Sequence, residues 1–225
     1  MLVTRRIPSS EWLVIAILLL FTTGLRFVGI NWGEPHLYTD IYSKQMIPLE
    51  TPLHPDEFLF VAKPLEMVVK GRFNPKFFHN PSFLINLNLV TFWITGADKN
   101  IAIADREGLS IRQYAPFHLY VIGRFYSALG GLLAVAATYA ATRGAGGKFA
   151  AFVAGLLIAV SLPMVQHSHY ATTSSLAAGF TAMAIWASFV ALRGNFKFLL
   201  IAGIAAGLAA GNRYNAAAVG IVVFM

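Results

Sequence analysis

The amino-acid sequence predicts an all-α protein: a polytopic bundle of about six transmembrane helices, with interfacial helices in a large first outer loop. Three observations lead to this fold class. Hydrophobic residues make up 57% of the 225 residues, charged residues make up only 12%, and the acidic residues gather in one segment. A soluble domain carries roughly 25% charged residues. The composition therefore excludes an ordinary soluble domain, and the absence of cysteine excludes a disulfide scaffold.

The net charge of +7 follows a membrane topology rather than a nucleic-acid-binding face. Nine of the ten acidic residues lie between Ile30 and Gln113, where the basic residues nearly balance them. The rest of the chain is strongly basic. Because Lys and Arg are enriched on the cytoplasmic side of membrane proteins, this asymmetry indicates a multi-pass protein. We expect a lipid bilayer and no nucleic acid among its partners.

The first apolar run, Trp12–Ile30, follows Arg5 and Arg6, which predicts a cytoplasmic N-terminus. A cleaved signal peptide is the weaker alternative, because the run is long and no Ala-x-Ala site follows it. Further spans or partial spans are predicted at Pro116–Ala141, Phe149–Met164, Ala171–Leu192, Phe196–Ala210 and Tyr214–Met225. The last run has no end signal, so residues 1–225 are expected to be the N-terminal part of one larger transmembrane domain.

The links between the later runs predict which side of the membrane each faces. Arg143–Lys148 and Arg193–Lys197 are short and basic, so both are placed in the cytoplasm. The opposite side then receives the 31–113 loop, the Gln166–Ser175 turn and the Gly211–Asn215 turn. Every polar cluster of interest is thus predicted to lie on the extracytoplasmic face.

The outer loop contains two predicted helices. Phe58–Lys70 has one apolar face and one charged face, the pattern of a helix that lies in the membrane interface. Pro81–Gly96 is apolar but too short to cross a bilayer, which favours a second interfacial or re-entrant helix. Later in the chain Gly203, Gly207 and Gly211 form a small-residue stripe that would let another helix approach closely.

The first candidate site is the segment His54-Pro55-Asp56-Glu57 at the start of the first outer-loop helix. A carboxylate there is a candidate general base or metal ligand at the membrane surface. Proline and acidic residues also favour any helix start, so a purely structural role is the alternative.

The second candidate site is the outer turn that contains His167, His169 and Tyr170. Two histidines alone do not make a metal site. Interfacial side chains that bond helix-end carbonyls are the structural alternative to substrate binding.

Three arginines occur in or near the apolar runs. Arg124 lies about ten residues into its run, where a charge is costly and needs an interior partner. An ion pair with an outer-loop acid and an anion-binding role are both open for it. Arg26 is expected to extend to the interface. Arg213 breaks the positive-inside trend, which an anionic ligand such as a lipid phosphate would explain.

Several segments, in order along nearly the whole chain, resemble family 39 membrane glycosyltransferases, which include protein O-mannosyltransferases and lipid A aminoarabinose transferases. The most specific are His54-Pro-Asp-Glu-Phe and His167-Ser-His-Tyr-Ala-Thr-Thr. The others are Asn31-Trp-Gly-Glu-Pro, Gly71-Arg-Phe-Asn-Pro, Phe78-His-Asn-Pro-Ser, Gly123-Arg-Phe-Tyr-Ser-Ala-Leu-Gly-Gly and Gly207-Leu-Ala-Ala-Gly-Asn-Arg-Tyr-Asn.

The resemblance implies transfer of one sugar from a polyprenyl-phosphate donor to a hydroxyl acceptor, which is a protein, lipid or glycan, on the extracytoplasmic face with inversion. It implies that Asp56 is the general base and that Glu57 orients or supports it. Arg213, and less directly Arg124, would bind the donor phosphate or hold the pocket, alongside His54, His167, His169 and Tyr170. An arginine or a divalent cation could stabilise the leaving phosphate.

The chain departs from the family pattern at two positions. Relatives often have an acidic residue where this chain has Ser174, and Lys where it has Arg213. The first departure removes a potential acidic site residue and weakens the case for a metal site. The second keeps the charge but changes its geometry. Family members are also about twice as long, so this segment alone is expected to be inactive.

Two other functions compete with the enzyme. A transporter or flippase of a lipid-linked anionic substrate would also need arginines at membrane depth, but along a path that reaches both faces. The one-sided polar clusters favour the enzyme. A non-catalytic membrane subunit with the same fold is the third hypothesis, and the serine at position 174 is its main support.

Overall fold

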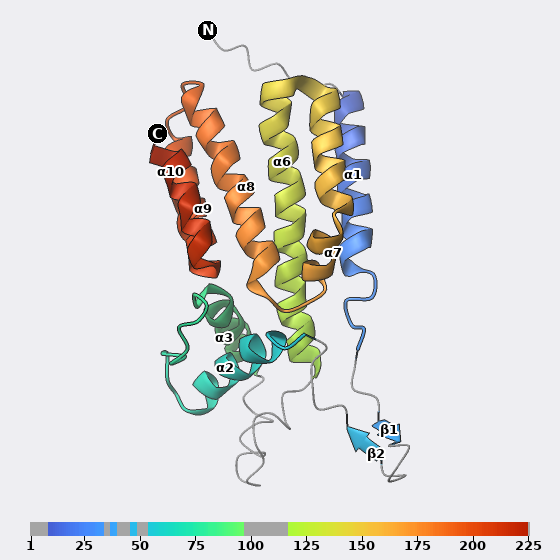
Figure 1. Ribbon diagram of the computed structural model, residues 1–225, viewed down its shortest axis with the longest axis vertical. Helices are drawn as coiled ribbons and strands as arrows, with labels where there is room; N and C mark the ends of the chain where they lie inside the picture. Colours follow the sequence, from blue (N-terminus) through green and yellow to red (C-terminus); the bar gives the residue numbers. More distant parts are fainter. Residues whose placement is uncertain (1–8, 34–36, 40–45, 49–53, 97–116, 225) are drawn as a thin grey trace.

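The computed structural model describes residues 9–33, 37–39, 46–48, 54–96 and 117–224. Within these residues long helices lie side by side in one bundle, and a smaller lobe sits at one of its ends (Figure 1). Part of the predicted acidic loop of residues 31–113 lies outside the described residues. Arg5 and Arg6 also lie outside them. The helices of the bundle are α1 (Ser9–Phe27), α6 (Phe117–Val160), α7 (Leu162–Ser168), α8 (Thr173–Leu192), α9 (Phe198–Asn212), the 3-10 helix η1 (Tyr214–Ala218) and α10 (Val219–Phe224).

Two predicted runs, Pro116–Ala141 and Phe149–Met164, form the two arms of α6. The chain reverses between them at one end of the bundle (Figure 1), where Gly147 has a φ of 83° and a ψ of −173°. A residue with a Cβ rarely adopts such a backbone. The first and second arms therefore run in opposite directions, as separate spans would.

A group of charges fixes this end of the bundle. Glu11 at the start of α1 is buried and is ion-paired with Arg143, and its second oxygen lies 3.5 Å from the Lys148 ammonium. The Tyr139 hydroxyl donates a hydrogen bond of 3.3 Å to the same carboxylate. The only acidic residue outside the outer loop thus ties α1 to the reversal of α6.

The sequence predicted an all-α fold, and the structure adds two short strands. β1 (Leu37–Thr39) pairs with β2 (Met46–Pro48) in an antiparallel two-stranded sheet within the first outer loop. The rest of the described chain is helix, turn or irregular segment. The all-α prediction is therefore correct for the bundle and its lobe but missed this hairpin, because neither segment alternates polar and apolar residues over more than three positions.

Two of the described helices, α6 and α8, are long and apolar enough to cross a membrane. The 20 residues of α8 correspond to about 30 Å, the thickness of the hydrocarbon core. α9 is apolar but has only 15 residues. These apolar helices therefore indicate a membrane protein. The number of six spans and the orientation of the bundle in the membrane remain predictions.

The smaller lobe consists of α2 (Glu57–Val69) and α3 (Phe83–Thr95), close to the predicted bounds. The apolar face of α2 does not point to lipid as its pattern suggested. Val61 and Leu65 are fully buried against Phe92 of α3 and against Leu119 and Tyr120 of α6. The lobe is therefore fastened to the bundle by the face that was expected to contact the membrane.

Arg26 is also placed differently from the prediction. Its side chain is fully buried, rather than extended to the interface. It donates hydrogen bonds to the carbonyl oxygens of Ala159 (3.1 Å) and Ile158 (3.2 Å) at the end of α6, and to that of Thr22 (3.4 Å). Helix-end carbonyls carry partial negative charge, which a guanidinium stabilises.

The closest helix approach occurs at glycines outside the predicted stripe. A Cβ on Gly130 of α6 would lie 2.6 Å from backbone atoms of Leu176, and one on Gly179 of α8 would lie 2.4 Å from the Gly130 carbonyl. Gly203 and Gly207 have no described neighbour within 4 Å of such a Cβ. Within the described residues the predicted stripe meets another helix only at Gly211, where a Cβ would lie 3.5 Å from the Cβ of Phe83 in α3. Gly130 and Gly179, by contrast, let α6 and α8 touch by their backbones.

We expect Gly130→Ala to lower the stability of the fold by about 1–3 kcal/mol, because backbone atoms of α8 cannot make room for the added methyl group. Thermal unfolding in detergent, followed by intrinsic fluorescence, measures the change. Gly203→Ala is the matched control: it has open space, and alanine favours a helix by up to about 1 kcal/mol. Equal melting temperatures for the two variants would contradict the close backbone contact.

Candidate functional site

An ion pair between Glu57 and Arg124 lies at the centre of the candidate site. Glu57 is the first residue of α2 and Arg124 lies in the first arm of α6. Arg124 donates through Nε to Oε1 at 2.8 Å and through Nη2 to Oε2 at 3.0 Å. The Glu57 side chain is 0% exposed and the Arg124 side chain is 1% exposed. Of the two roles left open for Arg124, the structure therefore shows the ion pair with an outer-loop acid.

The same pair bonds the backbone of two further segments. Arg124 Nη1 donates to the carbonyl oxygens of Ile30 (3.1 Å) and Trp32 (2.7 Å), just beyond α1. The backbone N–H of Ala171, in the turn before α8, donates to Glu57 Oε1 at 2.6 Å. One buried pair thus joins the segment after α1, the start of α2, the first arm of α6 and the turn between α7 and α8.

A small residue and a polar residue of α6 hold the turn between α7 and α8 in place. Ser127 Oγ donates to the Thr172 carbonyl at 2.9 Å, and the Thr172 N–H lies 3.3 Å from the same hydroxyl. Gly123 leaves room for Ala171, because a Cβ at position 123 would lie 2.6 Å from the Ala171 methyl. Ser127 and Gly123 both belong to the family-like segment that begins at Gly123, but neither was predicted as a site residue. Their spacing from Arg124, three positions after it and one before it, is the signal that could have found them.

Asp56 differs from its neighbour Glu57 in that its side chain has no partner among the described residues. It is half-buried, and within the described residues its carboxylate has no hydrogen bond or ion pair. Its backbone N–H lies 3.2 Å from His54 Nδ1, so this nitrogen accepts and the neutral ring carries its proton on Nε2. Of the two adjacent acids, Glu57 is committed to the fold and Asp56 is available for chemistry.

The aromatic side chains of the predicted site come together around His54. Its ring centroid lies 4.8 Å from that of Tyr170 and 6.3 Å from that of His167. Tyr170 in turn lies 6.0 Å from Trp32. The first outer loop and the α7–α8 turn, more than one hundred residues apart in the sequence, thus form one wall beside Asp56.

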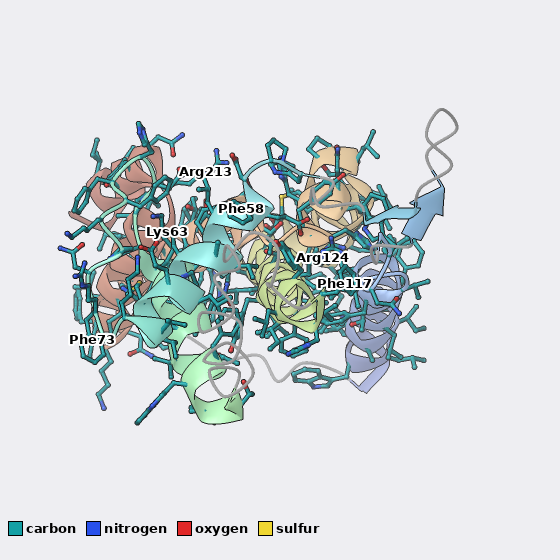
Figure 2. The ribbon with its side chains drawn as sticks, turned by 90° about the horizontal axis from the view of Figure 1, so that it is seen from below. Phe58, Lys63, Phe73, Phe117, Arg124 and Arg213 are labelled. Carbon is teal, nitrogen blue, oxygen red and sulfur yellow. The ribbon has the colours of Figure 1, made fainter. Side chains whose placement is uncertain are left out.

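Arg213, at the end of α9, supplies positive charge to the same region (Figure 2). Its Nη2 donates to Ser174 Oγ at 2.7 Å, so the two positions that depart from the family pattern contact each other. Arg213 Nε is buried without a hydrogen-bond partner, and so is His167 Nδ1. Within the described chain Arg213 forms no ion pair with a carboxylate, which leaves its charge available to an anion.

The electrostatic surroundings of His167 agree with an anion-binding region. Its pKa is lowered from the usual value, first by burial and then by the nearby His54 and Arg213. The neutral ring is therefore favoured while no anion is present. A negative ligand between His167 and Arg213 would reverse this preference.

His169 has a different environment from His167. Its Nδ1 lies 2.9 Å from the Val165 carbonyl oxygen and its Nε2 lies 3.1 Å from that of Val28. A carbonyl oxygen only accepts, so a neutral ring donates to one of these two carbonyls at a time. Either bond ties the ring to backbone, which is the structural alternative considered for this turn. Among the residues that the structure describes, no three His, Asp or Glu side chains are grouped to hold a metal ion.

Comparison with known families gives a match that includes Arg124, Arg213 and the α7–α8 turn. The matching family is described as dolichyl-phosphate-mannose-protein mannosyltransferase. Residues 120–225 of the chain match this family. Over residues 120–225 the match confirms the resemblance to family 39 glycosyltransferases, and together with the apolar helices it indicates a membrane protein of the glycosyltransferase kind.

The matched segment covers just under half of the chain. It contains Arg124, His167, Ser174 and Arg213, whereas Asp56 lies before it. No curated protein and no solved structure was found to match the chain. The roles proposed for individual residues therefore rest on the hydrogen bonds, ion pairs and burial described above.

Arg124→Met is expected to destabilise the fold by about 3–5 kcal/mol, because it leaves the Glu57 carboxylate buried and unpaired. The double variant Glu57→Gln/Arg124→Met should lose less than the sum of the two single variants, since it removes both charges. Thermal unfolding of the four proteins of this cycle measures the coupling. Arg193→Met, at an exposed arginine, should leave stability unchanged within about 0.5 kcal/mol. Additive effects in the cycle would contradict a direct pair.

Proposed function

We propose that the protein transfers a single sugar, of the mannosyl type, from a polyprenyl-phosphate donor to a hydroxyl acceptor at the extracytoplasmic membrane surface. The observation that carries this proposal is a half-buried carboxylate, Asp56, which is unpaired among the described residues and lies just before α2. It is at the same end of the bundle as the guanidinium of Arg213, just after α9, which has no carboxylate partner within the described chain. A base for the acceptor and a positive charge for the leaving phosphate are the two groups that such a transfer needs.

In this proposal Asp56 accepts the proton of the acceptor hydroxyl as the oxygen attacks the anomeric carbon. The bond between that carbon and the phosphate oxygen breaks, and polyprenyl phosphate leaves with the electron pair. Attack from the face opposite the phosphate inverts the anomeric centre. Glu57 and Arg124 act by position: their ion pair fixes the start of α2, and with it the residue before Glu57.

Arg213 and His167 are proposed to bind the donor phosphate. The serine at position 174 contacts Arg213 without neutralising it, whereas an acidic residue there would form an ion pair. The leaving phosphate is already a stable anion, so stabilisation of its charge is sufficient and no strong general acid is required. Tyr170 and His54 would form the wall against which the sugar lies.

The membrane placement supports the same orientation. The Asp56 segment, the α7–α8 turn and Arg213 all lie at one end of the bundle, and the basic turns at Arg143–Lys148 and Arg193 lie at the other (Figure 1). By the positive-inside rule the basic end is cytoplasmic. The proposed site then faces the side on which polyprenyl-phosphate sugars of this kind are used.

Asp56→Asn is expected to reduce sugar transfer by a factor of at least about 100, because general-base catalysis contributes roughly that much. Transfer is followed as loss of radiolabelled mannose from the polyprenyl-phosphate carrier, with the complete gene product in membranes. Donor binding should be retained, since the changed side chain does not contact the phosphate in this proposal.

Glu66→Gln is the matched control, an acid on the same helix that is paired with Lys70 (2.6 Å) and Lys63 (3.1 Å). It should transfer sugar at the unchanged rate. Equal transfer by wild type and Asp56→Asn would assign the base to another residue. Donor binding without any transfer in the wild type would favour the transporter or the non-catalytic subunit instead.

Donor affinity should rise as the pH falls through about 6.5, the usual pKa of histidine. The pKa of His167 is lowered in the free protein, and a bound phosphate anion raises it, so binding takes up a proton. The donor is a phosphodiester and does not itself titrate in this range. Binding measured between about pH 7.5 and pH 5.5 tests the slope. His167→Gln should abolish it, and an unchanged slope in that variant would show that another group takes up the proton.

A further inference from the structure

The lobe of α2 and α3 contains an apolar cavity that the proposed reaction does not use. Its volume is about 600 Å³, and it lies between the second half of α2, the turn that follows α2, and α3. The apolar walls are formed by Met67, Val68, Leu89, Val90 and Trp93. About sixteen residues, most of them in α2, separate its basic lining residue Arg72 from Asp56. At 1.5 Å per residue the helix places the two nearly 20 Å apart.

The surface around the cavity is apolar and exposed. On α3 the side chains of Val90, Trp93 and Ile94 are 51%, 71% and 73% exposed, and Phe73 in the turn after α2 is 88% exposed. Figure 2 shows Phe73 at the outer edge of the molecule. Patches of this kind mark contact with a membrane or another protein. Because α2 is fastened to α6 by its own apolar face, α3 and the turn are the parts of the lobe left to face the bilayer.

The charge at the rim of the cavity selects the kind of lipid. Residues 70–96 contain Lys70, Arg72 and Lys76 but no acidic residue. Lys70 is paired with Glu66, whereas the Arg72 side chain, which lines the cavity, has no ion pair among the described residues. An unneutralised guanidinium beside an apolar cavity at the membrane surface is complementary to the phosphate of a lipid headgroup.

We propose that this cavity binds an acyl chain of an anionic membrane phospholipid, with Arg72 at the headgroup phosphate. Trp93 then lies along the chain, at the depth where aromatic side chains are enriched in membrane proteins. The bound lipid fixes the lobe against the bilayer. This inference is independent of the proposed sugar transfer and concerns a different part of the lobe.

The experiment uses the complete gene product in lipid nanodiscs that contain phosphatidylglycerol or phosphatidylcholine, each with a photoreactive diazirine in one acyl chain. After illumination, mass spectrometry locates the labelled residues. The expected label lies between Met67 and Trp93 and is stronger with phosphatidylglycerol. A contact of about 1 kcal/mol per basic residue corresponds to a preference of about five-fold.

Two pairs of variants test the contact with the lipid headgroup and the contact with the acyl chain separately. Arg72→Gln should remove the preference for phosphatidylglycerol, and Arg193→Gln, at the other end of the bundle, should keep it. Val90→Trp fills the cavity and should abolish the label there. Ile94→Trp, on the same exposed side of α3 but outside the cavity lining, should retain it.

Label spread evenly over the lipid-facing helices, or an unchanged preference in Arg72→Gln, would overturn the proposal. Competition by unlabelled polyprenyl phosphate at equimolar lipid would also overturn it, because the cavity would then belong to the sugar donor. Loss of sugar transfer has no bearing on the result. The labelling pattern therefore tests lipid binding independently of the proposed sugar transfer.

Discussion

The buried ion pair of Glu57 and Arg124 holds together the parts of the chain that form the candidate site. Taking two charges out of water is costly, and the attraction between them repays that cost only when the remaining donors and acceptors are also satisfied. Here they are, because Arg124 also donates to the Ile30 and Trp32 carbonyls and Glu57 also accepts from the Ala171 N–H. The pair thereby joins four segments at one buried point, two through its side chains and two through backbone groups that it bonds.

The same pair gives two adjacent acids different roles. Successive helical residues point about 100° apart, so Glu57 can enter the interior while Asp56 stays at the surface beside His54. The fold thus uses one carboxylate as a fixed anchor, while the next has no partner among the described residues. Within the same described part of the chain, the hydrogen bond of the Arg213 guanidinium is to the uncharged hydroxyl of Ser174, which does not neutralise it. The separation of opposite charges within one site is the physical basis of the proposed function.

Close backbone packing sets the geometry around these charges. Gly130 and Gly179 bring α6 and α8 into backbone contact, and Gly123 admits the turn that carries Ala171. Any larger side chain at these positions would push the turn away from Glu57. The lobe of α2 and α3 is held to the bundle by side-chain packing instead, since Val61 and Leu65 of α2 pack against Leu119 and Tyr120 of α6.

The sequence by itself determined the class of the protein, the approximate bounds of the helices and the segments that form the site, because hydropathy and charge are local properties of the chain. It also supplied Asp56 and Arg213 as candidates. Only the tertiary structure decided which residues contact one another. It buried Arg26 at the end of α6, turned the apolar face of α2 inward, and assigned Glu57 rather than Asp56 to Arg124. Those outcomes depend on which segments meet in space, and periodicity within one segment carries no information about a contact with another.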